Sequence, residues 1–510
     1  MENSHQRRQS RRLRKSISPL FQHPFQLLHN PLPPFEMLNL EQVEQIHQAS
    51  MEILERIGVV FMDEEAIDLW AAAGAKVSSS DQRVRFDRNL VMELVAKAPS
   101  SFTWRARNPK RNVLVGKNVI AFAPHGGMAY ASNLDTGRHP GLLADFVNFV
   151  KLSHVCNMLN FNGGELVAIQ DVEPSNRHLK RLYTDFTLTD KALIEAAHGR
   201  IISRDVITMA EIVFGSLEGE PVLGGVINVS SPLRYDERMT GGLITFARFG
   251  QVNIITPFIM AGAMAPITMA AALAQQNAEA LAGIALAQLI RPGAPVIYGG
   301  FTTNVDMKSG SPAFGTPEGA WALLAGAQLA RRYHLPYRGS GSLNTSKLPD
   351  AQAAYETMWT MWPMVLAHTN FVLHSVGWLE GGLTASYEKF VMDAEMLAMF
   401  YHFLGGFTID DETLALDMIE LVGPGGHHFD TPHTQARYTS AFYESALADR
   451  LGYDTWLAQG GHDAAARANL IWKDLLAGYE TPYLDPIIET ALREFVEKRS
   501  RELSGVNLYD

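Results

Sequence analysis

Apolar positions follow helical spacing in residues 39–58 and alternate between strand-like and helix-like segments along most of the remaining chain. Residues 59–135 mix short extended runs with one helical segment, which predicts a small α+β unit. From about residue 140 to 405, short runs rich in Val, Ile and Phe alternate with amphipathic segments of helical length. The strand-like runs are 158–169, 191–197, 221–230, 252–260, 295–302, 336–343 and 370–379. This alternation predicts seven or eight β-then-α units.

Repeated strand-then-helix units build either a closed (β/α)8 barrel or an open, doubly wound sheet. Polar or Gly-rich residues follow almost every predicted strand, whereas the links from helix to strand are short. In a barrel these post-strand loops gather at the mouth, where active sites lie. No GxGxxG motif occurs at a strand-to-helix turn, as a dinucleotide-binding sheet would require. The pattern therefore favours an α/β protein built on a TIM-type (β/α)8 barrel.

The chain divides into four predicted regions. Residues 1–35 form a basic tail that we expect to be disordered, because an Arg-rich segment is followed by prolines and no unbroken apolar stretch completes a secretory signal. Residues 36–139 form an N-terminal α+β cap, 140–405 the catalytic barrel and 406–510 a C-terminal helical cap. No segment reaches the roughly 18 consecutive apolar residues of a membrane span, so we expect a cytoplasmic protein.

The charge balance narrows the class of partner. Lys and Arg total 43 against 54 Asp and Glu, giving a net charge of −11, which argues against a nucleic-acid ligand. A small molecule or a protein is the expected partner. The single cysteine, Cys156, excludes an internal disulfide and a cysteine-rich metal site, and its apolar context indicates a packing role. The apolar helix faces are compatible with a homo-oligomer or simply cover the barrel.

Aromatic residues gather at or near the predicted strand ends. They are Phe258, Tyr298, Phe301, Tyr337 and Trp378, with Tyr355 and Trp359 on the helix that follows one strand. Aromatic faces attract a quaternary ammonium group, with about 0.5–2 kcal/mol for each well-placed ring. Such a cage suits a methylated amine, although aromatic residues at helical spacing are more often part of a core.

Glycines also cluster at two strand ends, at Gly299–Gly300 and around Ser340 at Gly339 and Gly341. Without a Cβ atom, these positions allow a bulky planar ligand or a second backbone to approach closely. Tight packing inside the barrel explains any single pair, whereas the whole set at one rim indicates a ligand.

The segment GPGGHHFDTPHT places His427, His428, Asp430 and His433 within seven positions. Histidines and a carboxylate so close together suit a transition metal. Their spacing matches no zinc signature, and a loop whose histidines bond to the backbone explains them equally well. We therefore predict no metal site.

The run from residue 228 to 395 resembles the trimethylamine methyltransferase family. The phrases that carry the resemblance are NVSSPLRYDE, MAGAMAPITMAAALAQQNAEALAGIALAQLIRPGAPVIYGG, VDMKSGSPAFGTPEGA, LPYRGSGSLNTSKLPDAQAAYE and GPGGHHFDTPHT. The resemblance implies a (β/α)8 barrel whose mouth docks a separate corrinoid protein. It also implies an SN2-like methyl transfer from nitrogen to Co(I), which leaves a demethylated amine. A quaternary nitrogen leaves as a neutral amine, so the protein mainly orients the methyl group and excludes water. The resemblance identifies no catalytic acid or base.

One departure from the family pattern bears on the substrate. Family members that act on trimethylamine carry pyrrolysine in the barrel, in the segment equivalent to residues 344–348, where this chain has only ordinary residues. The resemblance therefore points to the branch without pyrrolysine, which acts on quaternary amines such as glycine betaine. A betaine also needs a group that holds its carboxylate, and a bidentate Arg is the usual solution. Arg338 is the first candidate, with Asn344, Asn304 and His374 behind it; a rim salt bridge from Arg338 to Asp350 or Glu356 is the alternative.

The corrinoid is expected to face Gly299, Gly300, Gly339, Ser340 and Gly341 together with two carboxylates, Asp306 and Glu318. These carboxylates, like Glu279, would attract the cation or bond to corrinoid amides, or would cap helices, which is the stronger reading for Glu318 just after a Pro. Two other functions remain open: direct methyl transfer to a folate-type acceptor, and a quaternary-amine sensor without catalysis.

Overall fold

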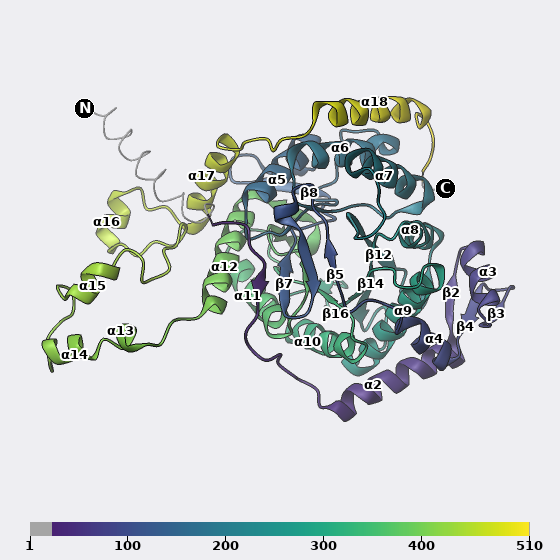
Figure 1. Cartoon of the computed structure of the whole chain (residues 1–510), viewed down its shortest axis with the longest axis horizontal. Coiled ribbons are helices and arrows are strands. Elements are labelled where there is room, and N and C mark those ends of the chain that lie inside the picture. The colour runs from purple at the N-terminus through teal and green to yellow at the C-terminus, as the bar shows by residue number, and fades with distance from the viewer. Residues whose placement is uncertain (1–22, 509–510) are drawn as a thin grey trace.

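A curled sheet of eight parallel strands lies at the centre of the computed structural model, which describes residues 23–508 (Figure 1). Neighbouring strands follow the order β7-β19-β18-β15-β14-β12-β11-β10. Their bounds are β7 Val119–Phe122, β10 Phe161–Gly163, β11 Ala192–Ile194, β12 Leu223–Val229, β14 Val252–Ala261, β15 Val296–Gly299, β18 Tyr337–Ser340 and β19 Phe371–Leu373. The predicted strand-like runs are confirmed.

Each strand of this sheet is followed by a helix that packs on its outer face (Figure 1). The helices are α5 Leu143–Val155, α6 Arg177–Leu188, α7 Gly199–Phe214, α8 Glu237–Arg248, α9 Met269–Ile290, α10 Pro317–Arg332, α11 Ala351–Leu366 and α12 Tyr387–Gly405. Helix α9 is buried along most of its length, because α2 and α4 cover its far side. Its polar residue Asn277 is satisfied inside the protein, since it donates to Ser50 Oγ and to the Tyr333 hydroxyl.

The two outer strands of the sheet, β7 and β10, approach each other. The backbone N–H of Asn160, next to β10, donates to the carbonyl of Phe122 at 2.8 Å. Strand β1 (Leu28–His29) pairs antiparallel with the start of β7, and Leu28 is buried. Part of the predicted tail is therefore folded, whereas residues 1–22 lie outside the described residues. Strand β7 lies in the region predicted as a cap but belongs to the main sheet. Its four apolar residues are all buried, and it pairs with β19.

One end of the sheet is blocked by the hairpin of β5 (Ser101–Trp104) and β6 (Val113–Gly116). The Trp104 ring lies inside the sheet, with its centroid 4.9 Å from that of Phe161 and 6.1 Å from that of Phe371. Since bulky apolar side chains fill this end, ligands can enter only from the opposite end, where the strands finish.

The N-terminal unit packs beside α9. It contains α2 Leu40–Glu52, the π-helical turn Ile53–Ile57, β2 Val59–Phe61, α3 Glu64–Ala72, β3 Lys76–Ser78, β4 Arg83–Arg85 and α4 Arg88–Val95. The helix predicted over 39–58 is confirmed, with Asn39 as its N-cap and Gly58 at its end with φ 81°. A fourth strand, β13 (Arg234–Tyr235), joins this small sheet.

Short elements surround the open end of the main sheet. They are the strands β8 Tyr130–Asn133, β9 Gly137–Pro140, β16 Phe301–Val305, β17 Pro312–Ala313, β20 Trp378–Leu379 and β21 Thr384–Ser386, with 3-10 turns at Pro109–Arg111, Pro174–Asn176 and Glu380–Gly382. Strand β14 continues past the central sheet to pair with β16, which places Phe258 directly beside Phe301.

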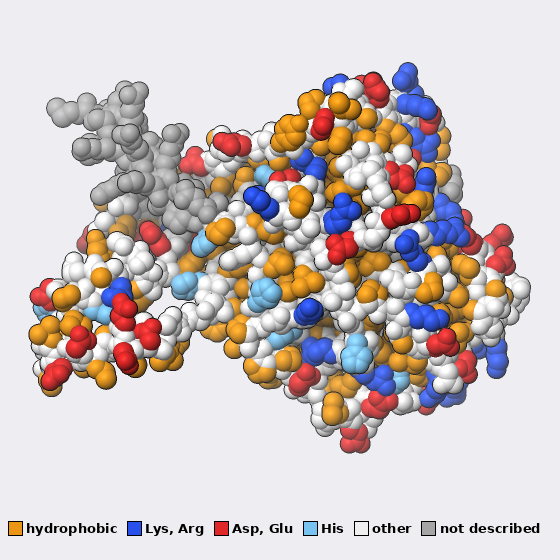
Figure 2. Space-filling view, in the orientation of Figure 1, with side chains coloured by type: hydrophobic (Ala, Val, Ile, Leu, Met, Phe, Trp, Pro, Cys, Tyr) orange, Lys and Arg blue, Asp and Glu red, His pale blue; other side chains and the backbone are white. Residues whose placement is uncertain are grey.

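The C-terminal part, predicted as a helical cap on the barrel, contains helices. Its helices are α13 Asp411–Leu414, α14 Leu416–Val422, α15 Pro432–Arg437, α16 Tyr453–Ala458, α17 Ala464–Ala477 and α18 Pro486–Glu502. Helix α17 packs on α12, whereas residues 406–462, the C-terminal arm, project away from the body (Figure 1). Hydrophobic and acidic side chains gather on this arm (Figure 2). None of the helices in residues 23–508 is long and apolar enough to cross a membrane.

Candidate functional site

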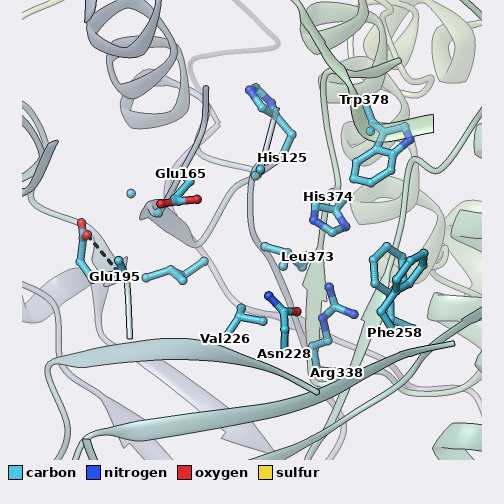
Figure 3. Close-up of a pocket in the computed structure, with 18 of the residues that line it drawn as sticks. His125, Glu165, Glu195, Val226, Asn228, Phe258, Arg338, Leu373, His374 and Trp378 are labelled. Carbon is cyan, nitrogen blue, oxygen red and sulfur yellow. Dashed lines mark hydrogen bonds between the residues drawn. The ribbon is translucent and has the colours of Figure 1, made fainter. Parts of the chain in front are cut away.

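A cavity of about 370 Å³ opens at the carboxyl ends of the parallel strands. This volume is typical of small-molecule sites. One wall carries aromatic side chains together with Arg338 and His374, and the facing wall carries Glu165 and Glu195 (Figure 3). Arg338 comes from β18 and Glu195 follows β11, which lie on opposite sides of the curled sheet. The cavity therefore has an aromatic wall that carries a buried cation and a facing wall that carries two carboxyl groups.

The aromatic wall combines residues from four separate segments. Phe258 and Phe301 are neighbours on β14 and β16, with ring centroids 5.0 Å apart. Phe314, just after β17, lies 5.6 Å from Phe301 and 5.6 Å from Trp378. Trp378 in turn lies 4.4 Å from His374. These ring faces and edges form a cage of the kind that attracts a quaternary ammonium group.

Arg338 is a buried cation without an anionic partner. Its side chain is fully enclosed, donates to the Gly300 carbonyl at 3.3 Å and lies 4.9 Å over the Phe301 ring, while its Nε has no hydrogen-bond partner. Within residues 23–508 it forms no ion pair, and burial lowers its pKa to about 9. The rim salt bridge is not formed, because Glu356 bonds to Thr345 and Asp350 caps α11. A ligand carboxylate would supply the missing counter-charge.

Two histidines line the cavity in their neutral form. His374 shares a hydrogen bond with the Ser340 hydroxyl at 3.1 Å, and burial holds its pKa well below the usual value. His125 bonds through Nδ1 to the carbonyl of Val376 at 3.1 Å, and burial lowers its pKa to about 4. Since the carbonyl accepts, Nδ1 carries the proton. The Nε2 atom of His125 is then an acceptor without a protein partner.

The opposite wall holds a group of carboxyls with one arginine. Glu165 forms an ion pair with Arg181, which lowers the pKa of Glu165 to about 2. Burial raises the pKa of Glu195 to about 7, and burial beside Glu195 raises that of Asp185 well above its usual value. One of the oxygens of Glu195, Oε1, has no hydrogen-bond partner. This wall therefore holds one ion pair and two carboxyls whose pKa values are raised by burial.

The structure brings together five of the eight predicted substrate-binding residues. Those that line the cavity are Phe258, Phe301, Arg338, His374 and Trp378. Tyr298 and Tyr337 point outward from their strands: Tyr298 bonds to Asn277 of α9, and Tyr337 packs over Gly326 of α10. Alternation along a strand explains this, because Tyr337 and Arg338 must face opposite sides of the sheet.

Other predicted residues lie outside the cavity lining. The Asn344 side chain donates to the carbonyl of Trp378 at 2.6 Å and so holds the cage from behind. Asn304 accepts from the Thr316 hydroxyl. Tyr355 and Trp359 lie on the outer surface of α11, each more than half exposed. Glu279 is buried and accepts from the Leu233 N–H at 2.8 Å.

The residues predicted to face the corrinoid pack against other parts of the protein and do not line the cavity. A Cβ atom on Gly299 would lie 2.4 Å from the Ile255 carbonyl, and on Gly339 2.2 Å from the Met364 sulfur. Gly300 and Gly341 are similarly close to Tyr337 and Met361. These glycines are explained by tight packing. Asp306 accepts from Ser309 within its own turn, and Glu318 lies in the first turn of α10.

Other glycines surround the cavity mouth. They are the pairs Gly126–Gly127, Gly163–Gly164 and Gly381–Gly382. Among residues 23–508 no three His, Cys, Asp or Glu side chains are grouped to hold a metal ion. His427 lies 3.5 Å from Asp430 in the C-terminal arm, where both side chains are exposed.

Several cavity residues were not predicted from the sequence: Glu165, Glu195, His125, His198, Asn228 and Phe314. All of them lie within four residues of a strand end: Glu195 follows β11 directly, and Glu165 comes two residues after β10. A polar residue close to a predicted strand end was therefore a signal that could have identified most of them.

Comparison with known proteins matches nearly the whole chain to one protein family. The family described as "Trimethylamine methyltransferase (MTTB)" matches residues 4–504. A glycine betaine methyltransferase of Desulfitobacterium hafniense (strain Y51) is 42% identical over 475 residues, covering 92% of this chain and 98% of that protein. The trimethylamine methyltransferase MttB of Desulfitobacterium hafniense (strain DSM 10664 / DCB-2) is 32% identical and covers 91% and 93%.

A solved structure shares the fold. The crystal structure of the hydroxylamine MtmB complex matches with a TM-score of 0.51 at 8% identity, covering 97% of this chain and 92% of that one. The curled α/β architecture is thus shared despite the low identity. On the sequence comparisons, the chain is a methyltransferase that belongs to the trimethylamine methyltransferase family.

Proposed function

We propose that this enzyme transfers a methyl group from a quaternary amine that carries a carboxylate, such as glycine betaine, to the Co(I) of a corrinoid held by a separate protein. The observation that carries the proposal is Arg338, a buried guanidinium without a counter-anion inside an aromatic cavity. The printed name of the relative from strain Y51 agrees with this substrate class. We also propose that the curled sheet closes into a full (β/α)8 barrel.

The zwitterion fits the charges of the cavity. Its carboxylate would accept two hydrogen bonds from Arg338, whose pKa of about 9 would then rise toward its ordinary value. Its trimethylammonium group would contact Phe258 and Trp378, which lie on the same side of the cavity as Arg338 (Figure 3), and Phe301, whose ring lies against Arg338. Neither end requires an acid or a base, because the quaternary nitrogen leaves as a neutral amine.

The corrinoid would approach from the mouth, where Gly126, Gly127, Gly164 and Gly381 have no close neighbour at the Cβ position and so leave room for a planar ring. Co(I) supplies the nucleophile that accepts the methyl group. The protein's own residues would fix the donor methyl in line with that approach and exclude water. Neutral His125 and His374 suit this role, since neither adds a second cation beside the ammonium group.

The test is methyl transfer to free, reduced cob(I)alamin, followed through the spectrum of methylcobalamin. Glycine betaine and other carboxylated quaternary amines should react, whereas trimethylamine and choline, which lack the carboxylate, should not. Reaction of trimethylamine alone would refute the proposed donor. If glycine betaine binds but cob(I)alamin is not methylated, the acceptor is a folate-type molecule or the protein is a sensor, and tetrahydrofolate in place of cobalamin separates these outcomes.

A further inference from the structure

The C-terminal arm, residues 406–462, has almost no core of its own. Only Thr431 and Leu447 of its residues are buried. Its helices α13 to α16 contain four, seven, six and six residues and bury none of them. Isolated helices of this length are not stable in water. The arm therefore needs another surface that is present whenever the chain is folded.

Twelve large hydrophobic side chains of the arm face solvent. They are Phe407, Ile409, Leu414, Leu416, Ile419, Leu421, Phe429, Tyr438, Phe442, Leu451, Tyr453 and Leu457. Phe407 and Phe442 are 87% and 86% exposed. So many large exposed hydrophobic side chains on one segment are unusual on a monomer and typical of a permanent interface. A transient partner such as a corrinoid protein, which must leave after each turnover, would use a more polar surface.

The same chain carries a second exposed apolar surface at the root of the arm, which we call the α11–α12 face. Tyr355 and Trp359 of α11 and Met399 and Phe403 of α12 are each more than half exposed there. The two helices are joined by Trp362, whose ring lies 5.5 Å from that of Phe403. Helix α12 leads directly into the arm (Figure 1), so arm and face adjoin in every copy.

Charge determines which of these surfaces can meet. The arm carries nine acidic residues against Arg437 and Arg450 only. Two arms would therefore repel each other. Helices α11 and α12 would not repel an acidic partner, because their carboxylates are all buried. These are Glu356, Glu388, Asp393 and Glu395. An aromatic face without exposed negative charge suits the acidic, apolar arm.

We infer that the arm of one chain docks on the α11–α12 face of a second copy and that the exchange is reciprocal, giving a dimer with two-fold symmetry. In such a dimer each residue contact occurs twice, so one pair of complementary surfaces closes the assembly. The arm is tied to its own body over residues 443–447: Glu395 accepts from the Tyr443 hydroxyl at 2.9 Å and from the Ala446 N–H, and Arg467 of α17 donates to the Leu447 carbonyl at 2.8 Å. The segments on either side of this tie are free to reach the second copy.

The test is the mass of the full chain in solution, measured by sedimentation velocity without substrate or corrinoid. The wild type should sediment as a dimer. Phe442→Asp on the arm and Trp359→Asp on the face should each weaken the dimer. With about 30-fold lost per contact and two contacts per dimer, the loss is about 1,000-fold. Leu40→Asp is the matched control, because Leu40 is 90% exposed on α2 and touches neither surface.

Mixing the two monomeric variants identifies the exchange itself. The intact arm of the Trp359→Asp chain should dock on the intact face of the Phe442→Asp chain, so the mixture should form a dimer with one of its two contacts. A monomeric wild type would overturn the inference. So would a Trp359→Asp variant that remains a dimer, since the arm would then dock elsewhere. Far-UV circular dichroism on each variant confirms that it is folded.

Discussion

Replacing Arg338 by Met should make the free protein more stable and unable to bind its donor. The buried guanidinium has one hydrogen bond, and burial lowers its pKa from 12.5 to about 9. That difference of about 3.5 pKa units corresponds to at most about 5 kcal/mol of unfavourable free energy in the folded state. Met fills a similar volume without charge, so we expect about 1–4 kcal/mol of stabilisation.

The same substitution removes the group that holds the carboxylate. Loss of one partner from a buried, hydrogen-bonded charge pair weakens binding by about 2–5 kcal/mol, which is about 30-fold to several thousand-fold in Kd. Calorimetry with glycine betaine measures this loss. Thermal unfolding with and without glycine betaine measures the stability of each form, and only the wild type should be stabilised by the ligand.

The sign of the charge effect can be checked with pH. Because the folded-state pKa of Arg338 is depressed, the cost of its charge is present at neutral pH and falls only as pH rises above about 9. Arg332→Met is the control: this residue pairs with Glu44 at 2.8 Å on the surface, so its loss should change stability by less than about 1 kcal/mol and leave binding intact. An Arg338→Met protein that binds glycine betaine as well as the wild type would refute the reasoning.

Three further outcomes are expected. Phe301→Leu should weaken glycine betaine binding by about 0.5–2 kcal/mol, because the cation interacts with the ring quadrupole. Binding of 3,3-dimethylbutanoate, the isostere that keeps the carboxylate but lacks the positive charge, should be nearly unchanged, and calorimetry with both ligands tests this. Burial raises the pKa of Glu195 to about 7, so the wild type loses folding stability as this group ionises between about pH 4.5 and 7. Glu195→Gln should therefore become more stable relative to the wild type over that window, by up to about 3 kcal/mol. Urea unfolding of both proteins at pH 5 and pH 8 measures the difference. Lys389→Met should cost about 3–5 kcal/mol, because it leaves Asp393 buried without its ion-pair partner, and the same urea experiment should show recovery in the Lys389→Met/Asp393→Leu double variant.

The sequence by itself determined the type and order of the main elements. The runs over 221–230 and 295–302 are largely apolar, short and followed by a polar residue, and each became a strand of the parallel sheet. Local chain chemistry sufficed here, because a buried parallel strand needs a continuous apolar segment and the helix that covers it needs an apolar stripe. The same reasoning placed Arg338 at a strand end, whereas in the structure it is the second of the four residues of β18.

Only the tertiary structure decided which neighbouring residues share the cavity. Alternation along β18 turns Arg338 inward and Tyr337 outward, and the phase of that alternation depends on the register with β15 and β19. Strand β7 was predicted outside the main sheet, because a short apolar run reads alike in a cap and in a core. Glu165 and Glu195 are separated from Arg338 by more than 140 residues in the chain, and only the curled sheet sets them across one cavity from it.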